Sequence, residues 1–310
     1  MKIVFLDAKT IGEDIDLSGF DALGEVVKYG FTTSDQVAER VKDCDVIVVN
    51  KVAMNAETLG NPANLKLICV TATGTNNLDK PYLDSKNIAW RNVAGYSTES
   101  VAQHTFSLLF YLLEHLPYYD IYVKSGTYAG DDSFTHFAKT FRELDGKTWG
   151  IIGLGEIGRR VAGLATAFGC KVIYYSTSGK NHNPDYDEVS FDELLSRSDI
   201  VSVHAPLDEN TKDLMNYEAF SKMKPTSIFI NVGRGPIVVE ADLRRALDEG
   251  LIGGAGLDVL CEEPMSKESP FLPDPPENLF ITPHIAWASI EARTRLMDLV
   301  LGHIKTFFGI

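Results

Sequence analysis

The stretch WGIIGLGEIGRRVAGLATAFG, residues 149–169, places three glycines in the spacing G-x-G-x-x-G between an apolar run and a helix-competent segment. In a strand–turn–helix of this kind, Gly153 permits the tight turn and Gly155 lets the backbone approach a pyrophosphate. Gly158 lets the helix pack closely on the strand, and the free N–H groups at the start of the helix attract phosphates. The stretch therefore predicts a dinucleotide-binding turn, with a simple packing turn as the alternative.

Apolar, strand-like runs alternate with helix-competent segments on both sides of this turn. The runs before it are KIVFLD, DVIVVN, LKLICVTATG and IAWRNV, and those from residue 147 onward are KTWGIIG, KVIYYS, DIVSVHAP, TSIFINVG, GAGLDV and LFITPH. Such alternation predicts β-α-β units, and hence parallel sheets covered by helices. A long apolar segment, residues 97–126, predicts a helix between the two sets and a boundary near residues 95–105. We expect a two-domain α/β protein, as the length of 310 residues also favours.

Composition and charge argue against several classes of function. The net charge is −14, and no stretch supplies the basic surface that binding to nucleic acids or anionic membranes requires. No run of about 18 apolar residues predicts a transmembrane helix, and the opening MKIVFLD is typical of a β-strand rather than a signal peptide. The four cysteines form no C-x-x-C pair, so we expect neither a disulfide framework nor a zinc site. These features predict a cytoplasmic protein.

Three candidate catalytic side chains follow strand-like runs of the second set. Arg234 stands between two glycines in FINVGRGPIV, Glu263 precedes a proline in GLDVLCEEP, and His284 follows a proline in ITPHIAWAS. Ligands of open α/β sheets bind at the carboxyl ends of strands, so these residues are expected at one edge. An arginine there can hold a carboxylate, and a histidine beside a carboxylate can transfer a proton. The alternatives are a surface arginine, a solvated acidic turn and a structural histidine.

Five stretches together resemble the D-isomer-specific 2-hydroxyacid dehydrogenase family: GLGEIGRRVA, DIVSVHAPLDENTKDLMN, INVGRGPIVVEADLRRAL, GAGLDVLCEEP and TPHIAWAS. The resemblance covers nearly the whole chain, and VTATGTNNLD and NVAGYSTESVAQHTF are most similar to glycerate dehydrogenases and hydroxypyruvate reductases. It implies two Rossmann-like domains with parallel sheets. These are a flavodoxin-like substrate domain, residues 1–97 and 286–310, and an inserted dinucleotide-binding domain, residues 98–285. It also implies a homodimer joined through the long helix.

The resemblance further implies reduction of a small 2-oxo acid, hydroxypyruvate or glyoxylate, to the D-2-hydroxy acid with NAD(P)H and without a metal. His284 is then the proton donor, Glu263 its partner and Arg234 the anchor for the substrate carboxylate. The other residues expected to bind substrate are Lys51, Thr73, Gly74 and Thr75. The residues expected to bind the cofactor are Gly153, Gly155, Glu156, Ile157, Gly158, Ser176, Thr177, Lys180, His204, Pro206, Thr211, Val232, Gly233 and Asp258, the last at the nicotinamide carboxamide.

The stretch KVIYYSTSGKN bears on the choice of cofactor. An NAD-specific domain usually carries an acid at the end of its second strand, about 20 residues after the glycine turn, where it binds the ribose 2′-hydroxyl. Ser176 takes that place here, and Thr177 and Lys180 follow it. Hydroxyls and a lysine can bind a 2′-phosphate, so the stretch favours NADPH over NADH. The alternative is that the hydroxyls bind a bare ribose and Lys180 is a solvated surface charge.

Two rival functions share features with this sequence. A short-chain dehydrogenase uses Tyr-x-x-x-Lys after its glycine turn, but Tyr82 and Lys86, which have this spacing, precede the turn. A nucleotide-sensing corepressor with the same fold keeps the glycine turn and the same catalytic residues, and it stays open as a binding protein. Oxidation of NAD(P)H with hydroxypyruvate at an ordinary enzymatic rate separates it from a dehydrogenase.

Overall fold

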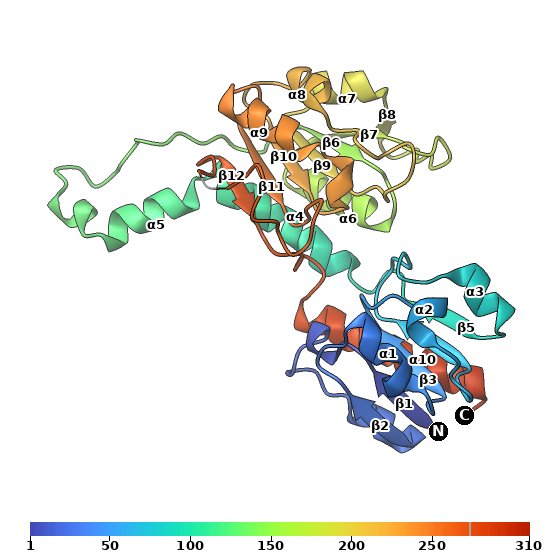
Figure 1. Ribbon diagram of the computed structural model, residues 1–310. Coiled ribbons are helices and arrows are strands. Elements are labelled where there is room, and N and C mark those ends of the chain that lie inside the picture. The colour runs from blue at the N-terminus through green and yellow to red at the C-terminus, as the bar shows by residue number, and fades with distance from the viewer. Residues whose placement is uncertain (273) are drawn as a thin grey trace. The chain divides into compact units, whose positions relative to one another are not determined.

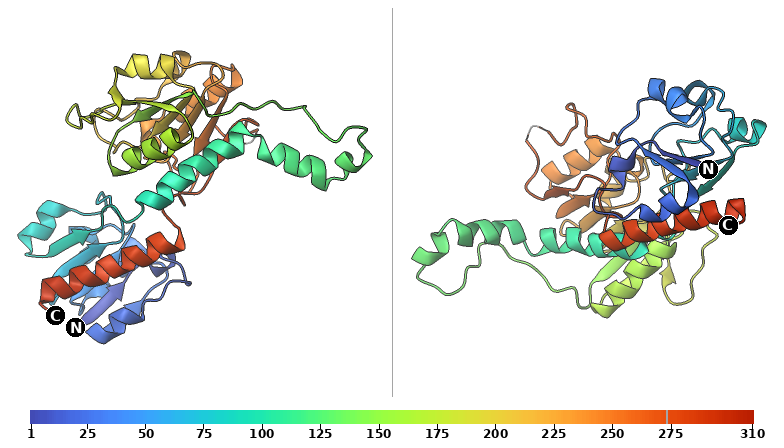
Figure 2. Two further views of the ribbon diagram at one scale, coloured as in Figure 1. Left: turned by 180° about the vertical axis from the view of Figure 1, so that it is seen from behind. Right: turned by 90° about the horizontal axis from the view of Figure 1, so that it is seen from below.

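The computed structural model describes residues 1–272 and 274–310, which divide into two compact units (Figures 1 and 2). The first unit combines Met1–Ser97 with Trp287–Ile310, and the second is Thr98–Ala286. The chain leaves the first unit after Ser97 and returns to it at Trp287, so the second unit is an insertion in the first. The sequence-based division at residues 285/286 differs from this one by Ala286 alone.

The first unit contains a parallel five-stranded sheet in the order β2-β1-β3-β4-β5. The strands are β1 (Lys2–Phe5), β2 (Glu25–Lys28), β3 (Val46–Val49), β4 (Leu67–Val70) and β5 (Ala89–Asn92). This order is that of flavodoxin-like sheets, which confirms the expected class. The apolar pattern missed β2, because its sequence EVVK lies at the sheet edge and none of its residues is buried.

Two apolar clusters cover the faces of this sheet, because alternate residues of a strand point to opposite sides. Ile3 and Phe5 belong to the cluster that includes side chains of the C-terminal helix α10 (Ile290–Phe308). Val4 belongs to the other cluster, with side chains of α1 (Ser34–Val41). Figure 2 shows α10 in red alongside the blue strands. The remaining helical segments are η1 (Ala8–Thr10), η2 (Ser18–Leu23), α2 (Ala56–Leu59) and α3 (Lys80–Ser85).

The second unit contains a parallel seven-stranded sheet in the order β12-β11-β10-β9-β6-β7-β8. The strands are β6 (Thr148–Ile152), β7 (Lys171–Tyr175), β8 (Asp187–Glu188), β9 (Ile200–Val203), β10 (Ile228–Asn231), β11 (Gly254–Leu257) and β12 (Leu279–Ile281). Strand order reverses between β6 and β9, which is the Rossmann switch point where such sheets bind ligands. The sequence did not predict β8, which has only two residues, both exposed acids.

Three helical segments of the second unit precede its first strand, namely α4 (Thr98–Leu113), α5 (Leu116–Lys124) and the 3-10 turn η3 (Thr127–Gly130). The others lie in the connections between its strands: α6 (Glu156–Ala167), α7 (Phe191–Arg197), α8 (Tyr217–Ser221), α9 (Glu240–Asp248) and the 3-10 turn η4 (Gly235–Ile237). Helix α4 comes very close to β11, since a Cβ at Gly256 would lie 3.0 Å from the Cβ of Leu108. Among the described residues, no helix has both the length and the apolar character needed to cross a membrane.

The expectation of one continuous helix over residues 97–126 is wrong. Helix α4 ends at Leu113, His115 adopts a left-handed φ of 52°, and α5 begins at Leu116. Pro117 lies in the first turn of α5, and in a continuous helix its ring would clash with the carbonyl four residues back. The predicted end does occur, because α5 stops at Lys124, and Gly126 follows with a φ of 82°.

Candidate active site

The glycine turn between β6 and α6 has the geometry that its spacing predicts. Gly153 adopts a φ of 89°, and a Cβ there would lie 2.8 Å from Cα of Ala205, so a side chain cannot be accommodated. A Cβ at Gly158 would lie 2.3 Å from the carbonyl oxygen of Gly153. Gly155, the N-cap of α6, differs because nothing lies within 4 Å of its missing Cβ. The turn thus leaves open space in front of a helix N-terminus, which fits a pyrophosphate.

The first turn of α6 and the loop after β10 contain further expected cofactor residues. Glu156 is exposed at the start of α6, and Ile157 beside it is partly buried. Val232 is buried, while the N–H of Gly233 donates to Oδ1 of Asn231 at 3.0 Å. These residues follow the carboxyl ends of β6 and β10 in the chain. This is the edge of the sheet where the sequence predicts a ligand site.

A neutral histidine lies on the other side of the switch point. The N–H of His204 donates to the carbonyl of Ile152 on β6 at 2.8 Å, and its Nε2 lies 3.0 Å from Oγ of Ser202. The Ser202 hydroxyl also accepts a hydrogen bond from Nε1 of Trp149 at 2.8 Å. Although part of the residue reaches the surface, the atoms packed around the ring lower the pKa of His204 to about 3.

The other ring nitrogen of His204, Nδ1, indicates a ligand site in a way that the sequence alone cannot. This atom is buried and has no hydrogen-bond partner within the described ranges, and the next residue, Ala205, touches the position of a Cβ on Gly153. An orphaned polar atom beside the glycine turn fits a site that a bound molecule completes. Sequence reasoning identified His204 but missed Ser202 and Trp149, which hold it.

Pro206 and Thr211 occupy the loop after β9. Pro206 is exposed, whereas Thr211 is fully buried and donates its hydroxyl to the carbonyl of Pro206 at 2.7 Å. The Thr211 hydroxyl also accepts the N–H of Asp208 at 2.8 Å. Thr211 therefore holds the loop together from inside, so direct contact between its hydroxyl and a cofactor is not what this geometry favours.

The end of β7 carries the residues expected to select the cofactor. Ser176 is buried, and its Oγ has no hydrogen-bond partner in the part of the chain that the structure describes. The N–H of Gly179 donates to the carbonyl of Ser176 at 3.2 Å, which forms a turn, and Lys180 is exposed just after it. On the neighbouring strand, Glu188 accepts hydrogen bonds from the Tyr174 hydroxyl and His182. The turn thus contains a buried serine and an exposed lysine where NAD-specific domains usually carry a carboxylate.

The structure brings together two of the three expected catalytic residues. Nδ1 of His284 lies 2.7 Å from Oε2 of Glu263, and both side chains are partly exposed. The other carboxylate oxygen, Oε1, accepts the N–H of Leu260 at 3.1 Å, which fixes the orientation of Glu263. With Nδ1–H donated to a carboxylate, Nε2 of His284 is left to exchange a proton with a ligand.

Arg234 lies in the turn after β10. A Cβ at the following Gly235 would lie 2.0 Å from the carbonyl carbon of Leu260, so this turn packs directly on the one that leads to Glu263. Nη1 of Arg234 donates to the carbonyl of Gly233 at 2.8 Å, and Asn231 donates to the carbonyl of Arg234 at 3.0 Å. The described residues include no carboxylate within 4.0 Å of the guanidinium. The charge is therefore free for an anion.

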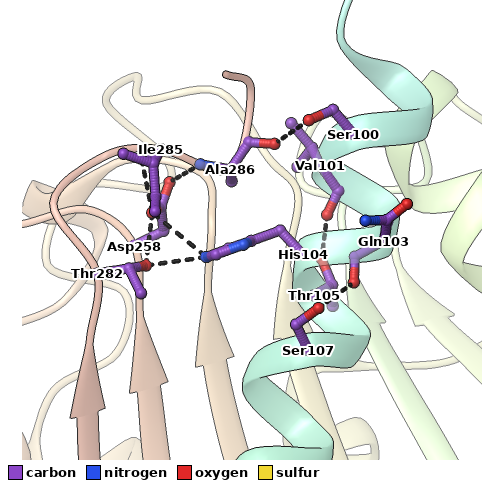
Figure 3. A network of polar contacts seen from close by, with 10 residues as sticks. All are labelled: Ser100, Val101, Gln103, His104, Thr105, Ser107, Asp258, Thr282, Ile285 and Ala286. Carbon is purple, nitrogen blue, oxygen red and sulfur yellow. Dashed lines mark hydrogen bonds and ion pairs between the residues drawn. The ribbon is translucent and has the colours of Figure 1, made fainter. Parts of the chain in front are cut away.

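The carboxylate of Asp258 has a structural role that the sequence did not indicate. The residue is 1% exposed, and Oδ1 accepts hydrogen bonds from the Thr282 hydroxyl at 2.6 Å and the N–H of Ile285 at 2.8 Å. Oδ2 accepts the N–H of Ala286 at 2.8 Å. Both oxygens thus hold the turn that carries His284 (Figure 3). Binding of a nicotinamide carboxamide by Asp258 stays a prediction.

The expected substrate residues of the first unit follow strands β3 and β4. The N–H of Lys51 donates to Oδ2 of buried Asp7 at 2.8 Å, and the side chain of Lys51 is exposed. The Thr73 hydroxyl donates to the carbonyl of Val93 at 3.1 Å, while Gly74 and Thr75 continue the same loop. Sequence reasoning missed Asp7, although an acid directly after the buried run KIVFL is a signal that could have found it.

Comparison with known proteins identifies the family of the chain. A family profile described as "D-isomer specific 2-hydroxyacid dehydrogenase, NAD binding domain" matches residues 106–286, which is more than half of the chain. The chain belongs to this dehydrogenase family. The dehydrogenase is 37% identical to the hydroxypyruvate reductase of Blautia hydrogenotrophica over 99% of its own length and 97% of that protein.

Two solved structures resemble the dehydrogenase over nearly its full length. A D-lactate dehydrogenase of Aquifex aeolicus, complexed with NAD and lactic acid, has a TM-score of 0.83 and 29% identity, and the match covers 99% of this chain and 95% of that one. An acyclic imino acid reductase in complex with NADPH and D-Arg has a TM-score of 0.87 and 28% identity, covering 100% and 97%. The protein is a nicotinamide-dependent D-2-hydroxyacid dehydrogenase.

Proposed function

We propose that the protein reduces a small 2-oxo acid, hydroxypyruvate or glyoxylate, to the D-2-hydroxy acid with NAD(P)H, and that His284 donates the proton. The observation that carries the proposal is the 2.7 Å contact between Nδ1 of His284 and Oε2 of Glu263 at the carboxyl edge of the second sheet. This edge also holds the glycine turn. The choice of acids is supported by the resemblance to a hydroxypyruvate reductase.

The roles of the side chains follow from their charges and contacts. The bound nicotinamide supplies a hydride for C2 of the oxo acid. The carboxylate of Glu263 accepts the Nδ1–H of His284 and orients the ring, so that the proton given to the carbonyl oxygen is the one on Nε2. Arg234 binds the substrate carboxylate through two N–H groups and polarises the carbonyl. Lys51 and the loop of Thr73, Gly74 and Thr75 in the first unit are also proposed to bind substrate.

A panel of 2-oxo acids tests the function. Purified protein should oxidise NADH or NADPH with hydroxypyruvate or glyoxylate at an ordinary enzymatic rate, and pyruvate and larger 2-oxo acids define the limits of the pocket. Cofactor binding measured by fluorescence provides the second arm. A protein that binds the cofactor but turns over none of these acids is a sensor rather than a reductase, and the proposal is then wrong.

We propose that NADPH is preferred over NADH. The glycine turn and the N-terminus of α6 are the expected pyrophosphate site, and Ser176, Thr177 and Lys180 the expected site of the 2′-phosphate. The absence of a carboxylate at position 176 and the exposed charge of Lys180 support this preference. Ser176→Asp should weaken NADPH binding much more than NADH binding, because it places a negative charge beside a phosphate. Dissociation constants and kcat/KM for both cofactors measure the effect. Negligible use of NADPH by the wild-type enzyme contradicts the proposal.

We also propose a homodimer formed through α5 and the segment after it. Large apolar side chains are solvent-exposed there, namely Leu116, Ile121, Val123, Tyr128, Phe134, Phe137 and Phe141. So many exposed apolar groups in one segment are typical of an interface. Light scattering should give twice the mass of one chain. Ile121→Asp, a change at a residue that is 66% exposed, should shift the protein toward the monomer. A wild-type monomer overturns the proposal.

A further inference from the structure

Helix α4 contacts both ends of the turn that carries His284 (Figure 3). Ser100 and His104 lie four positions apart, so their side chains share one face of the helix. Oγ of Ser100 donates to the carbonyl of Ala286 at 2.6 Å, and Nε2 of His104 lies 2.9 Å from Oγ1 of Thr282. Two side chains of one rigid helix thus bracket residues 282–286.

The direction of the hydrogen bond from His104 follows from what Thr282 already does. A hydroxyl has one hydrogen, and Thr282 donates it to Oδ1 of Asp258 at 2.6 Å. Thr282 must therefore accept from His104, which needs a proton on Nε2. Burial lowers the pKa of His104, although Asp258, 3.6 Å from Nε2, opposes this effect. The neutral ring with its proton on Nε2 is the form that completes the chain from His104 through Thr282 to Asp258.

The turn needs such support because its backbone is strained. His284 adopts a φ of 55°, a left-handed conformation that residues other than glycine rarely take. Asp258 counters the strain by accepting the N–H groups of Ile285 and Ala286, and its own carbonyl accepts the N–H of His284 at 2.8 Å. The position of the His284 ring therefore depends on where Asp258 is held.

We propose that His104, acting through Thr282 and Asp258, is a positioning residue for the proton-donating histidine, and that Ser100 secures the other end of the same turn. Neither α4 residue belongs to the proposed catalytic group, and the proposal rests on the function proposed for His284. The close approach of α4 to β11 at Gly256 makes the contact possible. Misplacing a reacting group by about 1 Å costs on the order of 100-fold in rate, so loss of this support should reduce turnover.

A matched pair of variants separates the hydrogen bond from the bulk of the ring. His104→Leu keeps an apolar side chain of similar size but removes the N–H. His104→Gln places an amide N–H near the position of Nε2. We expect His104→Leu to lower kcat by about 10- to 100-fold with little change in KM, because the ground-state contacts to the substrate remain. His104→Gln should restore most of the loss. Thr282→Val and Thr282→Ser form a second pair with the same expected pattern.

A measurement on the cofactor-free protein tests the positioning without any turnover. Hydrogen exchange of the Ile285 and Ala286 amides should be on the order of tenfold faster in His104→Leu and near the wild-type rate in His104→Gln. If wild-type protein reduces no 2-oxo acid, the proposed function fails, while the exchange experiment still decides whether α4 holds the turn. The thermal midpoint of each variant shows whether the fold is kept, and the Thr282 pair decides if His104→Leu does not fold.

The outcomes that overturn the inference are specific. Wild-type kcat and wild-type exchange in His104→Leu would show that the turn does not depend on this hydrogen bond. Equal losses in the Leu and Gln variants, and equal losses in Thr282→Val and Thr282→Ser, would assign these residues to packing alone.

Discussion

Each unit contains a buried aspartate after a strand of its sheet, and the two aspartates hold their loops in different ways. Asp7 follows β1 of the first unit and accepts the N–H groups of Asn50 and Lys51. Asp258 follows β11 of the second unit and accepts the N–H groups of Ile285 and Ala286. In each unit one carboxylate at the carboxyl edge of the sheet thus fixes a loop with a candidate functional residue.

The difference lies in the side chains that reach the carboxylate. Backbone N–H groups donate to Asp7, whereas Asp258 also accepts the hydroxyl of Thr282, which His104 of α4 contacts in turn. The turn at Asp7 carries Lys51, a proposed substrate residue, whereas the turn at Asp258 holds His284 in a left-handed conformation. In the proposed roles, the residue that transfers a proton has more support from side chains than the residue that binds an anion, because proton transfer needs closer positioning.

The largest expected effect comes from replacing His284 or Arg234, two of the proposed catalytic residues of the second unit. His284→Ala should lower kcat by about 10²–10⁴-fold, the usual contribution of general acid catalysis. Arg234→Ala should reduce kcat/KM strongly, because the substrate carboxylate loses its bidentate anchor. Steady-state kinetics measures both, with circular dichroism as the control for folding. Near wild-type kcat in His284→Ala contradicts the assignment of the proton donor.

The next largest effect comes from replacing the buried aspartate of each turn with asparagine. This pair of variants tests whether the two turns differ in role. Asp258→Asn should lower kcat by about 10- to 100-fold, since an amide cannot accept every N–H that holds His284. Asp7→Asn should instead raise KM for the 2-oxo acid, because the loop of Lys51 loosens while the proton donor stays in place. Each change should also cost about 1–3 kcal/mol of stability through an unsatisfied buried group. Equal losses of kcat in both variants would show that the two turns do not differ in role.

A smaller effect concerns the orientation of the His284 ring. Glu263→Gln should lower kcat by about tenfold, because an uncharged amide is a weaker acceptor for the Nδ1–H of His284 than the carboxylate is. Glu262→Gln is the matched control, since it makes the same change at the exposed neighbouring residue. Steady-state kinetics of both variants measures the effect. A loss of kcat in the control but not in Glu263→Gln contradicts the assignment of Glu263 as the partner.

The smallest effect is on stability and involves Asp7. Burial raises the pKa of Asp7 above its ordinary value of 3.8 and outweighs the N–H groups that favour the charged form. A group with a raised folded pKa contributes stability below its unfolded pKa and loses it as pH rises through the folded value. The free energy of unfolding of wild type relative to Asp7→Asn should therefore fall as pH rises from about 3.8. Urea denaturation at a series of pH values measures it, and a difference that grows with pH contradicts the expectation.

Much of the fold was predictable from local pattern. Strands β6 and β7 and the glycine turn carry their own signals, because close approach and tight turning demand glycine at fixed spacing. The missed elements lack such signals. Strands β2 and β8 are short edge strands with polar residues, and the break at His115 depends on Pro117 within an otherwise helical apolar run.

The sequence alone determined the α/β class, the cofactor turn and the strand ends where Arg234, Glu263 and His284 stand, since each follows from residues close together in the chain. Only the tertiary structure decided how His284 is held. Thr282 lies 178 positions from His104, and Ala286 lies 186 positions from Ser100. No periodicity or spacing records hydrogen bonds over such separations. They exist because Gly256 lets α4 pack closely on β11, and that packing is a property of the folded chain.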